Sequence, residues 1–196
     1  MAATFTSVVL GTLQDVLQVF AQGGDAGLTR GVGSTIGQEG EQEGWFRVLQ
    51  GKVPNELPFL TTSVRDLAFT AIQGFTVPGS CPDLNKIPLK TFQPLGLVKA
   101  PGAQSGPIQF TFKQDCALNS DLSAVYINQQ NLPIVEKVKV IGVTDGIVTV
   151  EANFPYTENL MNGLTLAVLT TSPGPFASAR AAVEKTAFGP ALIIIN

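Results

Sequence analysis

The first part of the chain carries apolar residues at helical spacing. They recur every three or four positions, at Val9, Leu13, Val16, Leu17 and Phe20. This period predicts an amphipathic helix over residues 5–22, and the glycine pair 23–24 is a typical stop signal.

A second helical pattern runs from about Leu28 to Gln50 and ends before Gly51. Its apolar side contains Val32, Ile36, Phe46 and Leu49. Glycines interrupt this segment, and each lowers intrinsic helicity by about 1 kcal/mol relative to alanine. We therefore expect packing, and not propensity, to hold this helix together.

A third, shorter helix is expected after two prolines, 54 and 58, that mark an extended connection. Ser63 is a favourable N-cap with Asp66 three residues later, and Gly74 follows the last periodic position. From Val77 onward the pattern changes, because prolines recur through residues 77–107. This stretch predicts a linker and a domain boundary.

Beyond the linker, short β-branched or alternating runs are separated by Gly, Asn, Asp or Pro. They cover residues 108–112, 123–128, 135–143, 146–152, 164–170 and 191–195. Their spacing favours an antiparallel sandwich, and Asp145-Gly146 predicts a tight hairpin turn. Residues 175–186 fit either a helical turn or an ordered loop.

The predicted fold class is therefore α+β, with an N-terminal helical hairpin and a C-terminal antiparallel β-sandwich. The expected domains are 1–76 (helical), 77–107 (Pro-rich linker) and 108–196 (sandwich).

Composition excludes several functional classes. The chain is 44% hydrophobic and 14% charged, with a net charge of −3 and no basic run, so nucleic-acid binding is not expected. Polar residues interrupt the N-terminal apolar segment, and no basic residue precedes it, so neither a membrane span nor a secretory signal is expected. The cellular location stays open.

Two cysteines are too few for a disulfide scaffold or a zinc site. A single bridge between Cys81 and Cys116 is one expectation, and two unpaired thiols are the other. The chain contains no histidine, which excludes a cysteine–histidine nucleophile or a serine–histidine triad within this chain.

One polar group on the second predicted helix could carry chemistry. Glu39, Gln42 and Glu43 share a helix face beside Ile36 and Phe46. Carboxylates that point inward are costly unless they bind a metal, pair with a cation or share a proton. The alternative interpretation is a solvated helix side with a glutamate at its rim.

Three segments resemble a fungal ferritin-like family of stress-response and late-sexual-development proteins, related to plant desiccation-related proteins. They are residues 39–47 (EGEQEGWFR), Pro58-Phe59, and residues 77–89 with their VPGSCP and IPL motifs. The resemblance implies a four-helix bundle followed by a small β-rich domain. Only two bundle helices have a counterpart here, which implies a half bundle.

The resemblance also bears on metal binding. The Glu-x-x-His ligand pair of such bundles falls on Glu39 and Gln42, where an amide replaces the imidazole. Half of the ligand set has no counterpart, so we expect no metal and no cofactor. Two apolar helices cannot bury their faces alone, so we expect a homodimer that completes a four-helix core.

Two functions follow as hypotheses. The first is a metal-free, degenerate ferritin-like protein with a structural, stress-related or binding role. The second is a metal-independent cyclase or isomerase for an apolar small molecule in fungal specialised metabolism. There, Glu39 and Glu43 would transfer protons, Gln42 would orient the ligand, and Trp45 and Phe46 would form an apolar wall.

Overall fold

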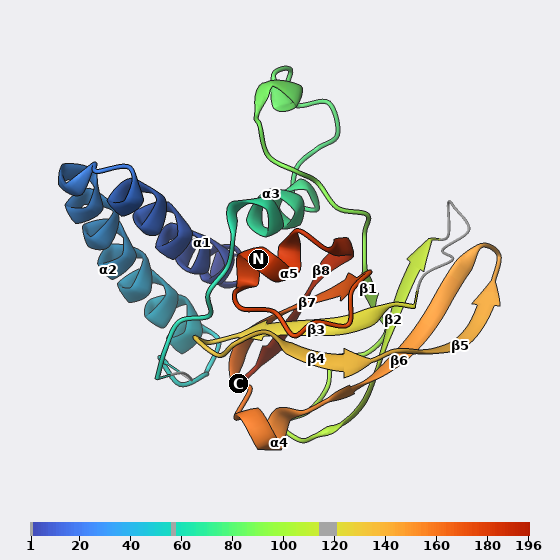
Figure 1. Cartoon of the computed structure of the whole chain (residues 1–196). Helices are drawn as coiled ribbons and strands as arrows, with labels where there is room; N and C mark the ends of the chain where they lie inside the picture. Colours follow the sequence, from blue (N-terminus) through green and yellow to red (C-terminus); the bar gives the residue numbers. More distant parts are fainter. Residues whose placement is uncertain (1, 56–57, 114–120) are drawn as a thin grey trace.

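Helices and two β-sheets form three layers in the computed structural model, which describes residues 2–55, 58–113 and 121–196 (Figure 1). The helices are α1 (Ala2–Gln22), α2 (Ala26–Leu49), α3 (Arg65–Gln73), the 3-10 turn η1 (Leu84–Lys86), α4 (Tyr156–Asn159) and α5 (Ala179–Val183). The strands are β1 (Gly96–Leu97), β2 (Gly106–Lys113), β3 (Ser123–Asn128), β4 (Ile134–Lys137), β5 (Lys139–Thr144), β6 (Ile147–Phe154), β7 (Gly163–Thr170) and β8 (Thr186–Ile195). The predicted α+β class is confirmed.

Within the described residues, the strands form two antiparallel four-stranded sheets. One has the order β1-β2-β6-β5 and the other β4-β3-β7-β8. Strand β7 is buried at every position, because the opposite sheet covers one face and helices cover the other. The second sheet is therefore the middle layer of the molecule.

Aromatic side chains fill the space between the sheets. Phe110, Tyr126 and Phe154 are fully buried, and the rings of Tyr126 and Phe154 meet edge to face at 5.5 Å. The Tyr126 hydroxyl donates to the Asn153 carbonyl oxygen at 2.8 Å, which satisfies its polar group inside the core. Burial, assisted by the charge of Glu136, raises the pKa of Tyr126 well above its ordinary value.

A second core joins the helices to the outer face of the middle sheet. Val8 of α1 and Leu67 of α3 pack there with Val125 and Val168 of the sheet, and Ala182 adds a contact from α5. Two helices that precede residue 77 thus share a core with strands beyond residue 107. The division of the chain into domains remains a prediction.

Helix α1 packs closely at Gly11 against the connection that precedes α3. A Cβ at this position would lie 2.3 Å from the Thr61 carbonyl oxygen, and the Gly11 carbonyl accepts a bond from Ser63 N–H at 3.2 Å. The Thr61 hydroxyl donates to the Leu164 carbonyl oxygen at 2.6 Å and accepts from Gln129 N–H at 2.9 Å. This segment therefore links α1 to the sheet.

Two local predictions from the sequence are wrong and one is confirmed. The N-cap of α3 is Val64, which forms no side-chain cap bond, and not Ser63. The Ser63 hydroxyl donates to the Val64 carbonyl oxygen, and Asp66 accepts from Lys90 N–H at 2.7 Å, so neither side chain forms the predicted cap. The run 135–143 is two strands, β4 and β5, in different sheets. The hairpin turn at residues 145–146 is confirmed, since both residues have positive φ.

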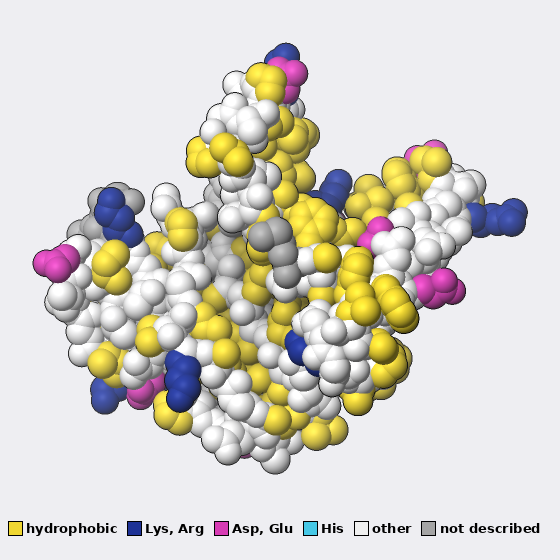
Figure 2. Space-filling model, turned by 180° about the vertical axis from the view of Figure 1, so that it is seen from behind, with side chains coloured by type: hydrophobic (Ala, Val, Ile, Leu, Met, Phe, Trp, Pro, Cys, Tyr) yellow, Lys and Arg dark blue, Asp and Glu magenta, His cyan; other side chains and the backbone are white. Residues whose placement is uncertain are grey.

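Two stretches that the sequence predicts as a linker, or as either a helical turn or a loop, contain regular structure. Residues 175–186 include the short helix α5, whose N-cap Ser178 accepts a bond from Ala181 N–H at 3.2 Å. The Pro-rich stretch 77–107, predicted as a linker, includes η1, β1 and the first residues of β2. Between α3 and β1 the chain rises as a projecting loop with η1 at its tip, drawn in green at the top of Figure 1. Figure 2 shows the same loop from behind, with charged side chains of both signs at its tip.

Candidate functional site

A hollow of about 170 Å³ lies where the base of the helical hairpin meets the sandwich. Its lining comes from both helices, the following connection and the start of β7: Ser7, Leu10, Gly40, Glu43, Gly44, Arg47, Pro54, Asn55, Leu60, Thr61 and Leu164. The two charged side chains of this lining, Glu43 and Arg47, are one helical turn apart on α2.

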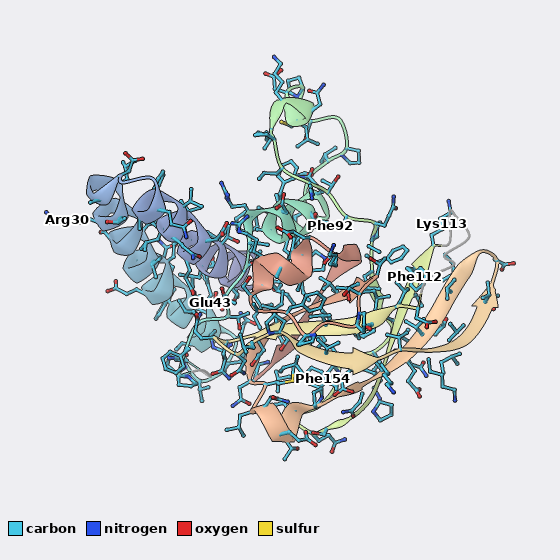
Figure 3. The ribbon with its side chains drawn as sticks, viewed as in Figure 1. Arg30, Glu43, Phe92, Phe112, Lys113 and Phe154 are labelled. Carbon is cyan, nitrogen blue, oxygen red and sulfur yellow. The ribbon has the colours of Figure 1, made fainter. Side chains whose placement is uncertain are left out.

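Glu43 faces α1 across this hollow. The Ser7 hydroxyl donates to Glu43 Oε1 at 3.0 Å, so the carboxylate joins the two helices. Figure 3 labels Glu43 near the base of the hairpin, beside the start of the sandwich. Of the five residues that sequence reasoning selected on α2, this is the one that lines the hollow.

The other four selected residues lie elsewhere on α2. Glu39 and Phe46 are half-buried, Gln42 is exposed, and Trp45 is 60% exposed. A half turn of rotation separates Trp45 from the inward side that carries Glu43, which explains its exposure. The structure thus does not bring the five together, and their predicted roles remain predictions.

Arg47 is buried, with only 3% of its surface exposed, and the sequence did not predict this. Its Nε donates to the Val53 carbonyl oxygen at 2.8 Å, and its Nη1 donates to Asn196 Oδ1 at 3.2 Å. One guanidinium therefore ties α2 to the connection that follows it and to the end of β8. A buried arginine at a helix end carries no distinctive sequence signal, because arginine also favours exposed helix ends.

A second buried charge lies on α1. Asp15, with a side chain that is 4% exposed, accepts a bond from Arg65 Nε at 2.9 Å and also pairs with the guanidinium of Arg180. These bonds join α1 to α3 and α5. The only sequence signal was a lone aspartate on an apolar helix, which also fits a solvent-facing position.

Two further hollows lie on the outer face of the sheet that contains β2 and β6. They measure about 440 and 300 Å³ and share Pro107 and Glu151. Gln109 Nε2 donates to Glu151 Oε2 at 2.9 Å across the strands. Another hollow of about 400 Å³ lies beside α3 in the projecting loop and includes Cys81.

The predicted disulfide is not supported. Cys81 is an exposed free cysteine, and Cys116 lies outside the described residues. Among the described residues, no group of three or more His, Cys, Asp or Glu side chains lies together as a metal-ion site would require.

Helix α1 has the length and apolar composition of a membrane-spanning helix, judged on these two properties alone. A helix that packs within a protein core, or a signal sequence near an N-terminus, satisfies the same criteria. In this fold, α1 buries Val8 and Leu10 and carries the buried charge of Asp15.

Comparison with known proteins leaves the family open. No family model matches the chain. No curated protein matches it either. The fungal ferritin-like resemblance therefore remains a hypothesis that depends on the motifs in residues 39–89.

Proposed function

We propose that the protein is a metal-free, degenerate ferritin-like protein with a structural, stress-related or binding role. The observation that carries this proposal is the bonding of the charged groups at the base of the hairpin. Glu43 bonds to Ser7, and Arg47 bonds to Val53 and Asn196. These contacts connect separate segments of the fold, as expected of residues that maintain an architecture.

The size of the hollow also supports this role. Pockets for drug-sized ligands usually measure about 300–1,000 Å³. The hollow beside Glu43 measures about 170 Å³. A drug-sized ligand would therefore exceed the volume of this hollow.

The first experiment is elemental analysis of protein purified after expression in its native host, by inductively coupled plasma mass spectrometry. We expect iron and manganese far below one equivalent per chain. Stoichiometric iron or manganese that survives gel filtration would overturn the metal-free role. Zinc and nickel, measured in the same run, control for adventitious metal.

The structural role has its own test in a double-mutant cycle. Ser7→Ala and Glu43→Ala should each lower the free energy of unfolding by about 1 kcal/mol, because each removes one side of a partly buried hydrogen bond. The double variant should cost clearly less than the sum of the two. Strict additivity in urea denaturation would contradict a structural bond between these residues.

A metal-independent enzyme, of the cyclase or isomerase type, is the second candidate function. One observation favours it: Glu43 lines a hollow whose other walls include Leu10, Leu60 and Leu164. If the protein is such an enzyme, an apolar compound from a small-molecule panel should bind it and raise its melting temperature. In addition, Glu43→Gln should abolish turnover while the melting temperature stays unchanged.

A further inference from the structure

One side of α2 is left open along most of its length. Of its 24 residues only Arg47 is buried. On the side turned away from α1, the exposed residues Arg30, Ser34, Gly37 and Glu41 follow one another at alternating spacings of four and three. Residues at this spacing form one continuous stripe on a helix. We call these four residues the α2 stripe.

We propose that the α2 stripe pairs antiparallel with the same stripe of a second copy of this chain. The proposal rests on the structural or binding role above and names the partner. In a two-fold arrangement, Arg30 of one copy lies opposite Glu41 of the other, and Ser34 lies opposite Gly37. Each of these contacts occurs twice, as an isologous interface requires.

Charge selects this orientation. Neither Arg30 nor Glu41 makes an ion pair with another residue of the described chain. Figure 3 shows the Arg30 side chain pointing away from the hairpin, where another molecule can reach it. Antiparallel pairing forms two Arg–Glu pairs, whereas parallel in-register pairing would place like charges together.

Small residues at the centre of the α2 stripe let the two helices come close. No atom lies within 4 Å of where a Cβ of Gly37 would be, so this space is open for a partner. Beyond Glu41 the exposed side continues with Trp45 and Val48, which are 60% and 46% exposed. In the proposed register they reach the α1–α2 turn of the other copy and bury apolar surface there.

A charge-reversal cycle tests the register. The dissociation constant is measured by sedimentation equilibrium for the full chain and for Arg30→Glu, Glu41→Arg and the double variant. Each single reversal should weaken the dimer by about tenfold or more, since it replaces two ion pairs with two like-charge contacts. The double reversal should restore the affinity to within about threefold of the original. Lys86→Glu, at the tip of the projecting loop, is a control that should leave the dimer unchanged.

A steric pair of variants separates association from folding. Gly37→Leu places a side chain in the proposed contact, whereas Gly31→Leu places one on a neighbouring open side of α2. Both substitutions should raise helix stability. Only Gly37→Leu should weaken the dimer, by at least about tenfold, because overpacking of a close helix contact is unfavourable.

The pairing would be overturned by a monomer at about 100 µM, by single reversals that leave the affinity unchanged, or by a double reversal that fails to restore it. A dimer with unchanged affinity in Gly37→Leu would do the same. None of these results touches the metal-free role, which depends on elemental analysis and the Ser7–Glu43 cycle. The two proposals can therefore fail separately.

Discussion

The sandwich and the helical hairpin bury their residues to very different extents. Every residue of β7 is buried, whereas α2 buries one residue of 24. The sandwich is therefore stabilised by apolar burial on both faces of its middle sheet. The hairpin docks through the buried apolar residues of α1, the close approach at Gly11, the Asp15 ion pairs and the Arg47 bonds. Substitutions in the two regions should therefore lower the free energy of unfolding by different amounts and for different reasons.

The largest expected effect is in the core between the sheets. Phe110→Ala should lower the free energy of unfolding by about 3–5 kcal/mol, because it empties a fully buried site. Leu28→Ala, at a position of α2 that is 53% exposed, should change it by less than about 0.5 kcal/mol. Urea denaturation followed by circular dichroism compares the two. Similar losses would contradict the difference between the regions.

The second-largest expected loss of stability concerns Asp15, the buried carboxylate that joins α1 to α3 and α5. Asp15→Ala should cost about 2–3 kcal/mol, below the usual range for a fully buried pair, because Arg65 and Arg180 remain partly exposed to water. Hydrogen exchange should then speed up in α1 more than in β7. Equal acceleration in both would show that Asp15 supports the whole fold and not the docking of α1.

A pair of glycine substitutions should have opposite signs. Gly11→Ala should destabilise by about 1–2 kcal/mol, since the clash with the Thr61 carbonyl oxygen outweighs the gain in helix propensity. Gly31→Ala should stabilise by up to about 1 kcal/mol, because nothing lies near its Cβ position. Thermal denaturation at one fixed protein concentration measures both. Effects of the same sign would contradict the difference in packing around these two glycines.

The smallest expected effect is a change in the pKa of Glu158 at the surface of the sandwich. The Ser105 hydroxyl donates to Glu158 Oε2 at 2.6 Å and, with a backbone bond, lowers the pKa of this carboxyl. Ser105→Ala should raise that pKa toward its ordinary value, while Ser105→Thr should keep it low. A depressed pKa gives stability that is present above the unfolded-state pKa and is lost as the pH falls through the folded-state pKa. Carbon-detected NMR titration of Glu158 is the measurement, and equal pKa values in all three proteins would refute the assignment.

The strands could be predicted because their pattern is local. Alternation along β6 places Val148, Val150 and Ala152 on one buried face, and this period is visible in the sequence. The turn at Asp145-Gly146 is equally local, because positive φ favours these residue types. The division between β4 and β5 could not be predicted, since the β-branched pattern continues while the chain changes sheets.

The charged residues show the opposite case. Asp15 interrupts an apolar helix and reads as solvent-facing, yet Arg65 and Arg180 meet it from distant parts of the chain. The sequence predicts both Glu43 and Trp45 as site residues, yet Glu43 lines the hollow and Trp45 is exposed. Helical spacing specifies which residues share a face, but it does not specify which neighbour that face meets.

The sequence by itself determined the periods, the turns and the absence of imidazole, because each depends on residue type or on neighbours a few positions away. Only the tertiary structure decided that α1 docks through Gly11 and Asp15, that Arg47 is buried, and that one side of α2 stays open. These features depend on contacts between segments far apart in the chain, such as Arg47 with Asn196. Contacts of this kind become visible only once the layers have packed.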